Sequence, residues 1–179
     1  MKTDVKMEKQ MKALAELVFI SEIVLQSKIA QKVGKRLPGP HDRFDHIEVW
    51  CAIQSILAAA GNVSKILWPQ KKYAARGEYL RKLLNVDKSN LLSDRKFRNH
   101  FEHYDERIEV WFEKNSSAVF ADLSIDPFEP IWDRKLDNRH RVYNPLTQTL
   151  TFRGESFDLA AVLNTLEEIR LKCRPNALQ

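Results

Sequence analysis

An unbroken stretch of helical periodicity runs from about Asp4 to Val33 and, more than any other feature, limits the folds open to this chain. Apolar residues recur there at spacings of three, four and seven, namely Met7, Met11, Leu14, Val18 and Leu25, with Leu17, Ile20 and Val24 widening the stripe. Gly34 and the segment Pro38-Gly39-Pro40 end the pattern. The spacing predicts one long amphipathic helix whose stripe faces a core.

Further helices are predicted over residues 44–60, 62–67, 78–84, 93–114 and 159–172. In 44–60 the expected inward side chains are Phe44, Ile47, Trp50, Ile53, Ile56, Leu57 and Ala60, with Gly61 as the stop and Asn62 as the cap of the next helix. Helix 93–114, capped by Ser89 or Ser93, carries an aromatic-rich stripe of Phe97, Phe101, Tyr104, Ile108, Trp111 and Phe112. Asp158 is expected to cap the last helix.

The composition changes after residue 116. Two short runs, 141–144 and 149–152, predict β-strands joined by a turn over Pro145-Leu146-Thr147-Gln148. Long striped helices with short connections indicate a mainly α fold, an antiparallel helical bundle with a small C-terminal β-hairpin and a final helix. We expect residues 1–116 to form the bundle and residues 117–179 an extension packed on the same domain.

Composition excludes several classes of protein. The chain has 179 residues, 44% hydrophobic and 30% charged, which fits one compact domain and not a disordered chain or a disulfide scaffold. The apolar run at residues 17–20 is far too short to cross a membrane, and the charged N-terminus lacks the apolar core of a secretory signal. Cys51 and Cys173 are expected to be buried, reduced thiols. These features predict a cytoplasmic protein without membrane association.

One helical segment concentrates side chains that carry chemistry, from Arg95 to Arg107. At about 100° per residue, Asn99 and His103 lie about 40° apart on one face, in an arc opposite the aromatic stripe. The simplest interpretation is a solvated face whose ion pairs each contribute a few tenths of a kcal/mol. A metal site is not expected, because His100 and His103 have no third strong ligand at helical spacing. The sequence also shows no phosphate-binding glycine loop, nucleophile elbow or CxxC pair, and no cofactor is expected.

The segment Arg98-Asn99-His100-Phe101-Glu102-His103 resembles the R-x(4–6)-H motif of the HEPN superfamily, with a polar residue directly after the arginine. The resemblance covers about residues 4–114 and implies a helical bundle with the motif in a late helix. It further implies a metal-independent endoribonuclease. In that reaction His103 acts as general acid or base, Arg98 stabilises charge on the phosphate, and Asn99 orients the imidazole or the phosphate. Arg95, His100 and Glu102 are then expected to contact the substrate.

The resemblance also implies partners. A homodimer would bring two copies of Arg98, Asn99 and His103 into one cleft, which supplies both proton-transfer roles. RNA is the expected substrate because it has the 2′-hydroxyl nucleophile, and an antitoxin or a nucleotidyltransferase is the implied protein partner. The basic residues Lys65, Lys71, Lys72, Arg76, Arg81 and Lys82 either line an RNA approach or only increase solubility.

Two other functions remain open at the level of sequence. One is a non-catalytic HEPN module that binds a nucleotide or a partner protein, which the acidic neighbours Glu102, Asp105 and Glu106 favour because they repel a phosphate backbone. The other is a purely structural helical dimer, built by the long first helix and the C-terminal hairpin.

Overall fold

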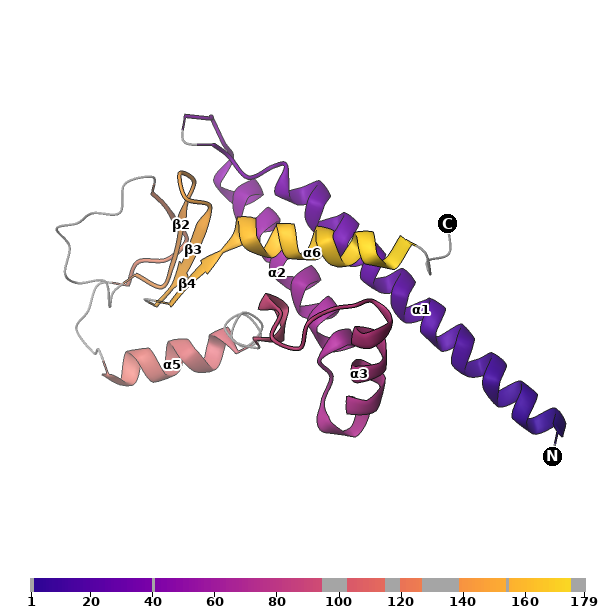
Figure 1. The fold of residues 1–179 in the computed structure, drawn as a ribbon. Helices are drawn as coiled ribbons and strands as arrows, with labels where there is room; N and C mark the ends of the chain where they lie inside the picture. The colour runs from indigo at the N-terminus through magenta and orange to yellow at the C-terminus, as the bar shows by residue number, and fades with distance from the viewer. Residues whose placement is uncertain are drawn as a thin grey trace.

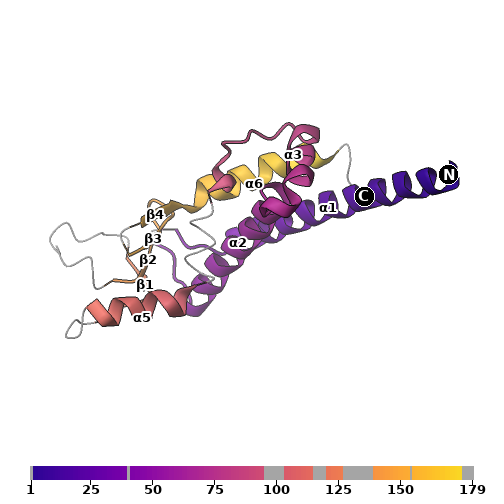
Figure 2. The ribbon, with the colours of Figure 1, turned by 90° about the horizontal axis from the view of Figure 1, so that it is seen from below.

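The computed structural model describes residues 2–39, 41–94, 103–114, 120–126, 139–153 and 155–174, with side chains described from Lys12 onward. These residues form a mainly helical protein with a small sheet and a C-terminal helix, as the sequence predicts (Figure 1). The sheet and helix α5 lie at one end of the helical body, and the N-terminal end of α1 projects at the other (Figures 1 and 2).

Three helices make up the body. Helix α1 (Lys2–Gly34) is followed by α2 (His46–Leu67), which runs back alongside it, and α6 (Leu159–Cys173) packs on both (Figure 1). Asp45 caps α2 by accepting a hydrogen bond from the Glu48 backbone N–H at 2.9 Å. Asp158 caps α6 in the same way through Ala161 at 2.8 Å, which confirms that prediction.

Shorter elements follow α2. The 3-10 turn η1 (Lys71–Tyr73) leads into α3 (Ala74–Leu83), which begins earlier than the predicted 78–84 helix, and a second 3-10 turn, η2, spans Leu91–Ser93. Ser93 is the last residue of this turn, and the residues after Asp94 that the predicted cap would precede lie outside the described part of the chain. Of the predicted helix 93–114 the structure describes α5 (Tyr104–Lys114), while residues 95–102, with Phe97 and Phe101, lie outside the described residues.

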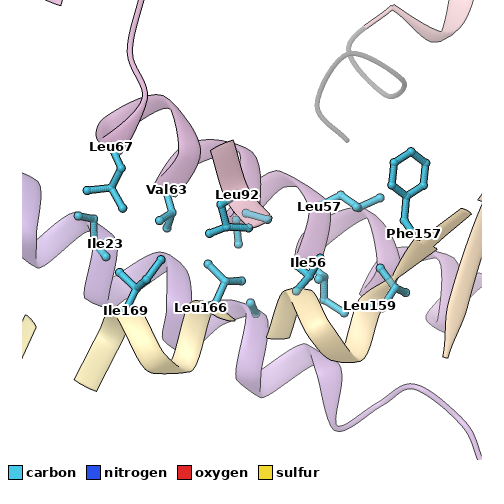
Figure 3. Close-up of a cluster of buried hydrophobic side chains, with 14 of the residues drawn as sticks. Ile23, Ile56, Leu57, Val63, Leu67, Leu92, Phe157, Leu159, Leu166 and Ile169 are labelled. Carbon is cyan, nitrogen blue, oxygen red and sulfur yellow. The ribbon is translucent and has the colours of Figure 1, made fainter. Parts of the chain in front are cut away.

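The core forms where these elements meet. Ile23 of α1, Val63 of α2 and Ile169 of α6 point toward one another (Figure 3). Leu92 of η2 and Phe157 of the sheet belong to the same buried cluster (Figure 3). Residues from both sides of position 116 thus share one hydrophobic core.

The sheet is larger than the predicted hairpin. Strands β2 (Arg141–Asn144) and β3 (Thr149–Phe152) pair antiparallel as predicted, and Asn144 accepts hydrogen bonds from the Leu146 and Thr147 N–H groups in the turn. Strand β4 (Glu155–Asp158) pairs antiparallel with β3, and β1 (Ser124–Ile125) pairs parallel with β2. The second half of the chain therefore contributes a four-stranded sheet to the core.

The inward face of α1 was predicted only in part. Leu14, Val18 and Leu25 of the predicted stripe are 60%, 56% and 50% exposed, whereas Ile20, which widens that stripe, is 0% exposed. The other buried positions, Ile23, Ser27 and Ala30, lie outside the predicted stripe and are also 0% exposed. Periodicity detects an apolar stripe, but α1 has apolar residues on two sides, and packing against α2 and α6 selects the side that carries Ile20 and Ile23.

Helix α2 also differs from the prediction. It continues through Gly61, which is buried, because the packing of the surrounding helix outweighs the roughly 1 kcal/mol by which glycine weakens a helix. Phe44 precedes the Asp45 cap and is 46% exposed, and Ile47 in the first turn is 65% exposed, so neither faces the core. Cys51 is exposed, against expectation, whereas Cys173 is buried as predicted.

Helix α2 is also long and apolar enough to cross a membrane, judged by length and composition alone. Within its most apolar window, 61% of the residues are buried inside the protein. That degree of burial is typical of a core helix in a folded domain, and this is the position α2 has between α1, α3 and α6.

Candidate functional site at the start of helix α5

His103 lies directly before α5, and its backbone carbonyl accepts the first helical hydrogen bond, from the Arg107 N–H at 3.2 Å. Its imidazole is 51% exposed. The ring Nδ1 lies 3.4 Å from Oε1 of Glu106, one turn further along the helix. Glu106 therefore occupies the Nδ1 side of the half-exposed ring. Asp105 and Glu106 also suit the positive end of the helix dipole.

The next residue, Tyr104, fixes this end of α5 to the sheet. Its hydroxyl donates to Oδ2 of Asp122 at 2.6 Å and accepts a hydrogen bond from Nη2 of Arg141 at 3.1 Å. The Arg141 guanidinium also lies over the tyrosine ring, 4.1 Å from its centroid. Because Arg141 is the first residue of β2, these contacts connect the start of α5 directly to the sheet.

Asp122 and Arg141 form a close ion pair beneath the tyrosine. The Nε of Arg141 donates to Oδ1 of Asp122 at 2.9 Å, and each side chain is only 11% exposed. Burial acts to raise the pKa of Asp122, but hydrogen bonds from Arg141 and Tyr104 outweigh it and hold that pKa below its ordinary value. Burial and the hydrogen bond to Asp122 raise the pKa of Tyr104 to about 12, so its hydroxyl stays protonated at neutral pH and holds the helix without exchanging protons.

Two further contacts hold α5 along its length. Arg153, after β3, donates from Nη1 to the backbone carbonyl of Arg107 at 3.0 Å. Trp111 is 2% exposed and packs edge-on against His140, with ring centroids 4.8 Å apart. Figure 2 shows α5 alongside the sheet. His103 therefore projects from a helix that is attached to the sheet at three points.

The structure describes only part of the predicted site. His103 is exposed at the surface, in a position that solvent can reach. The other predicted site residues, Arg95, Arg98, Asn99, His100 and Glu102, lie outside the described residues. Among the side chains that are described, no group of three or more histidine, cysteine, aspartate or glutamate residues gathers in a way that could hold a metal ion.

The contacts of the predicted basic residues place them at the C-terminal end of α2. Arg76 and Arg81 donate hydrogen bonds to the backbone carbonyls of Lys65 and Leu67 in the last turn of α2. Lys82 forms an ion pair with Glu78 at 2.9 Å. The start of α5 lies near the opposite end of α2, where Trp50 donates to the Leu123 carbonyl. At 1.5 Å per residue the two ends of α2 are about 30 Å apart.

Sequence reasoning missed the residues that position the histidine. Tyr104 was assigned to the aromatic core stripe, and no sequence signal joins it to Asp122 and Arg141, which lie 18 and 37 residues away. The contact between His103 and Glu106 could have been predicted from the sequence, because residues three apart meet on one helix face.

The arrangement offers one exposed imidazole with a carboxylate on Nδ1, on a helix held firmly to a sheet. Such a pair can accept or donate a proton at Nε2. Comparison with known proteins identifies no family: no family model, no curated protein and no solved structure matches the chain.

Proposed function

We propose that this chain is a metal-independent endoribonuclease of the HEPN type. The observation that carries the proposal is the segment from Arg98 to His103, together with the exposed imidazole of His103 at the fixed start of α5. The mainly helical fold with this segment late in the helical part is consistent with a HEPN-like bundle.

In the proposed reaction His103 exchanges a proton at Nε2 with the 2′-hydroxyl or with the leaving 5′-oxygen of RNA. Glu106, whose Oε1 lies 3.4 Å from Nδ1, orients the ring. Arg98 provides bidentate charge to the phosphate, and Asn99 orients the imidazole or the phosphate. Arg95, His100 and Glu102 contact the substrate around the scissile bond.

The reaction needs two proton-transfer groups, and one chain provides a single Arg98–His103 pair. A second copy of this helix, related by a two-fold axis, supplies the other. The cleft of the proposed enzyme is therefore shared between two chains, and its specific activity should fall when the protein is diluted below the dissociation constant of the pair.

The decisive experiment uses the purified full chain and a labelled single-stranded RNA in the presence of EDTA. We expect cleavage that leaves 2′,3′-cyclic or 3′-phosphate ends. His103→Ala should lower the rate by about 10²–10⁴-fold, the usual contribution of a general acid or base. The matched control is His46→Ala, because His46 is an exposed histidine on α2 with no part in the proposed chemistry. Dependence on added magnesium, or a His103→Ala variant as fast as the parent, would refute the proposal.

A second candidate function is a non-catalytic HEPN module that binds a partner protein such as an antitoxin or a nucleotidyltransferase. The specific observation in its favour is the acidic first turn of α5, where Asp105 and Glu106 are both exposed and would repel a phosphate backbone. The basic side chains of α3 lie near the far end of α2 and do not offset this charge. Absence of RNA cleavage by the parent protein, with the fold intact, would favour this candidate.

A further inference from the structure

Helix α1 carries two apolar faces on opposite sides. At about 100° per residue, the buried positions Ile20, Ile23, Ser27 and Ala30 centre on one direction, and Leu14, Val18, Leu25 and Ile29 centre about 180° away. The second set is 60%, 56%, 50% and 37% exposed. One stripe is sufficient to attach a helix to its own core. A second, exposed apolar stripe is typical of an interaction surface.

The spacing of this exposed stripe is symmetric about its own midpoint. Leu14 and Ile29 are equally distant from the point between Ser21 and Glu22, and so are Val18 and Leu25. A two-fold axis through that point places Leu14 beside Ile29 of a second copy and Val18 beside Leu25 of that copy. We propose that α1 pairs antiparallel with α1 of a second copy of this chain, through this stripe.

Charge favours the antiparallel orientation. Lys28 and Lys32 flank the stripe, and both are exposed. Parallel pairing in register would bring each lysine beside its own copy, whereas antiparallel pairing brings Lys28 to the level of Ala15. Glu22 lies beside the axis, but its Oε1 accepts a hydrogen bond from Gln26 of the same helix at 2.7 Å, which directs the carboxylate along its own chain.

The contact has the size that a specific but modest dimer needs. The stripe from Leu14 to Ile29 is roughly 22 Å long at 1.5 Å per residue. Two helices about 10 Å wide that touch over this length bury on the order of 1,000 Å² in total, which is near the lower limit for specific interfaces. Figure 2 shows α1 along one edge of the body, where a second helix can approach it. We therefore expect association in the micromolar range.

This contact is separate from the α5 pairing in the proposed function. Helix α5 and the sheet lie near the C-terminal end of α1, so antiparallel pairing of α1 leaves the two α5 helices apart and accessible (Figures 1 and 2). Two different two-fold contacts on one chain close into an assembly of four chains when their axes are perpendicular. The α1 contact does not depend on catalysis and can be tested without it.

The first experiment measures mass by sedimentation velocity over a range of concentrations. The double variant Val18→Glu/Leu25→Glu should abolish the α1-dependent association. It places charges in the seam, which is the contact between the exposed apolar stripes of the two α1 helices. The matched control, Asn62→Glu/Asn164→Glu, adds the same charge at two exposed helical positions and should associate like the parent. Circular dichroism should show equal helix content in all three proteins. An equal mass for the parent and the seam variant at every concentration would refute the contact, whatever RNA cleavage shows.

The second experiment tests the register by disulfide trapping, in a Cys51→Ser background because Cys51 is exposed. A Val18→Cys chain mixed with a Leu25→Cys chain should form a mixed disulfide rapidly. Each single-cysteine chain alone should form a disulfide-linked dimer no faster than an Asn62→Cys control. The reason is that the same position in the two copies lies about seven residues apart along the antiparallel seam. Faster trapping of each variant with itself would show parallel pairing and overturn the proposed register.

Discussion

Asp122 and Arg141 form a two-pronged ion pair beneath the Tyr104 hydroxyl, although they lie 19 residues apart in sequence. Each side chain is 11% exposed, so the pair is held in an environment where loss of one partner leaves an uncompensated charge. This relationship fixes the start of α5, and with it His103, relative to the sheet.

The first prediction concerns this pair. Arg141→Ala should lower the free energy of unfolding by about 1–3 kcal/mol, because the half-buried Asp122 carboxylate loses its counter-charge and keeps the Tyr104 hydroxyl as a donor. The double variant Asp122→Leu/Arg141→Met should lose clearly less, because it removes both charges. Urea unfolding followed by circular dichroism measures both values. A double variant as unstable as Arg141→Ala would contradict the account.

The second prediction concerns a close approach between helices. A Cβ atom on Gly77 of α3 would lie 2.4 Å from Cδ of Pro69 and 2.7 Å from the Leu67 carbonyl oxygen. Because neither group can move freely, Gly77→Ala should lower the free energy of unfolding by about 1–3 kcal/mol.

Gly34→Ala is the matched control for this prediction, since the nearest atom there is Cδ1 of the flexible Leu163 side chain at 2.9 Å. Thermal unfolding of both variants should show the larger decrease in midpoint for Gly77→Ala. Equal decreases would show that the close contacts with Pro69 and Leu67 are not the reason why Gly77→Ala destabilises the protein.

The third prediction is a pH dependence from His140. The residue is 1% exposed, and neither ring nitrogen has a hydrogen-bond partner among the described residues. Burial, together with the charge of Arg153, holds the pKa of His140 below its ordinary value. As the pH falls through about 6.5, the imidazole of His140 therefore takes up a proton in the unfolded chain but stays neutral in the folded chain. Titration of His140 should therefore leave the free energy of unfolding unchanged above pH 6.5. Below pH 6.5 it should lower that free energy, by at most about 1.4 kcal/mol per pH unit.

His140→Phe tests this dependence, because a phenyl ring keeps the packing against Trp111 and Phe120 without a titrating group. The difference in unfolding free energy between pH 7.5 and pH 5.5 should be smaller in the variant than in the parent. His41→Phe, at an exposed loop position, should leave the difference unchanged. A parent and a His140→Phe variant with the same difference would remove His140 as the cause.

The fourth prediction concerns the two thiols. Cys51 is exposed, whereas Cys173 is 0% exposed and burial raises its pKa to about 11. A thiol reagent should modify one thiol per native chain and two per unfolded chain. Cys51→Ser should abolish the native reaction, and rapid native labelling of this variant would contradict the burial of Cys173.

Local signals predicted the elements that depend on neighbours in sequence. The Asp158 cap and the hairpin turn over residues 145–148 were predicted, because each depends on side chains that bond to the backbone within three residues. The inward face of α1 depended instead on which of two apolar sides met α2 and α6, and periodicity is the same for both. Strand β1 escaped prediction because its two residues pair in parallel with a strand far along the chain.

In the candidate site, too, the contacts between residues close in sequence were predictable and those between distant residues were not. His103 and Glu106 lie on one helix, so the sequence could place them together. The residues that hold this helix, Asp122 and Arg141, come from different segments that meet only in the folded protein. Their ion pair has no periodicity or spacing that a single sequence reveals.

The projection of α1 beyond the body has a practical consequence (Figures 1 and 2). A chain immobilised on a sensor surface through its first residues would present helix α5 and the sheet to the flowing solution, because they lie at the other end of the molecule. Attachment through the first residues is therefore the orientation in which RNA fragments or protein ligands should reach helix α5 without hindrance from the support.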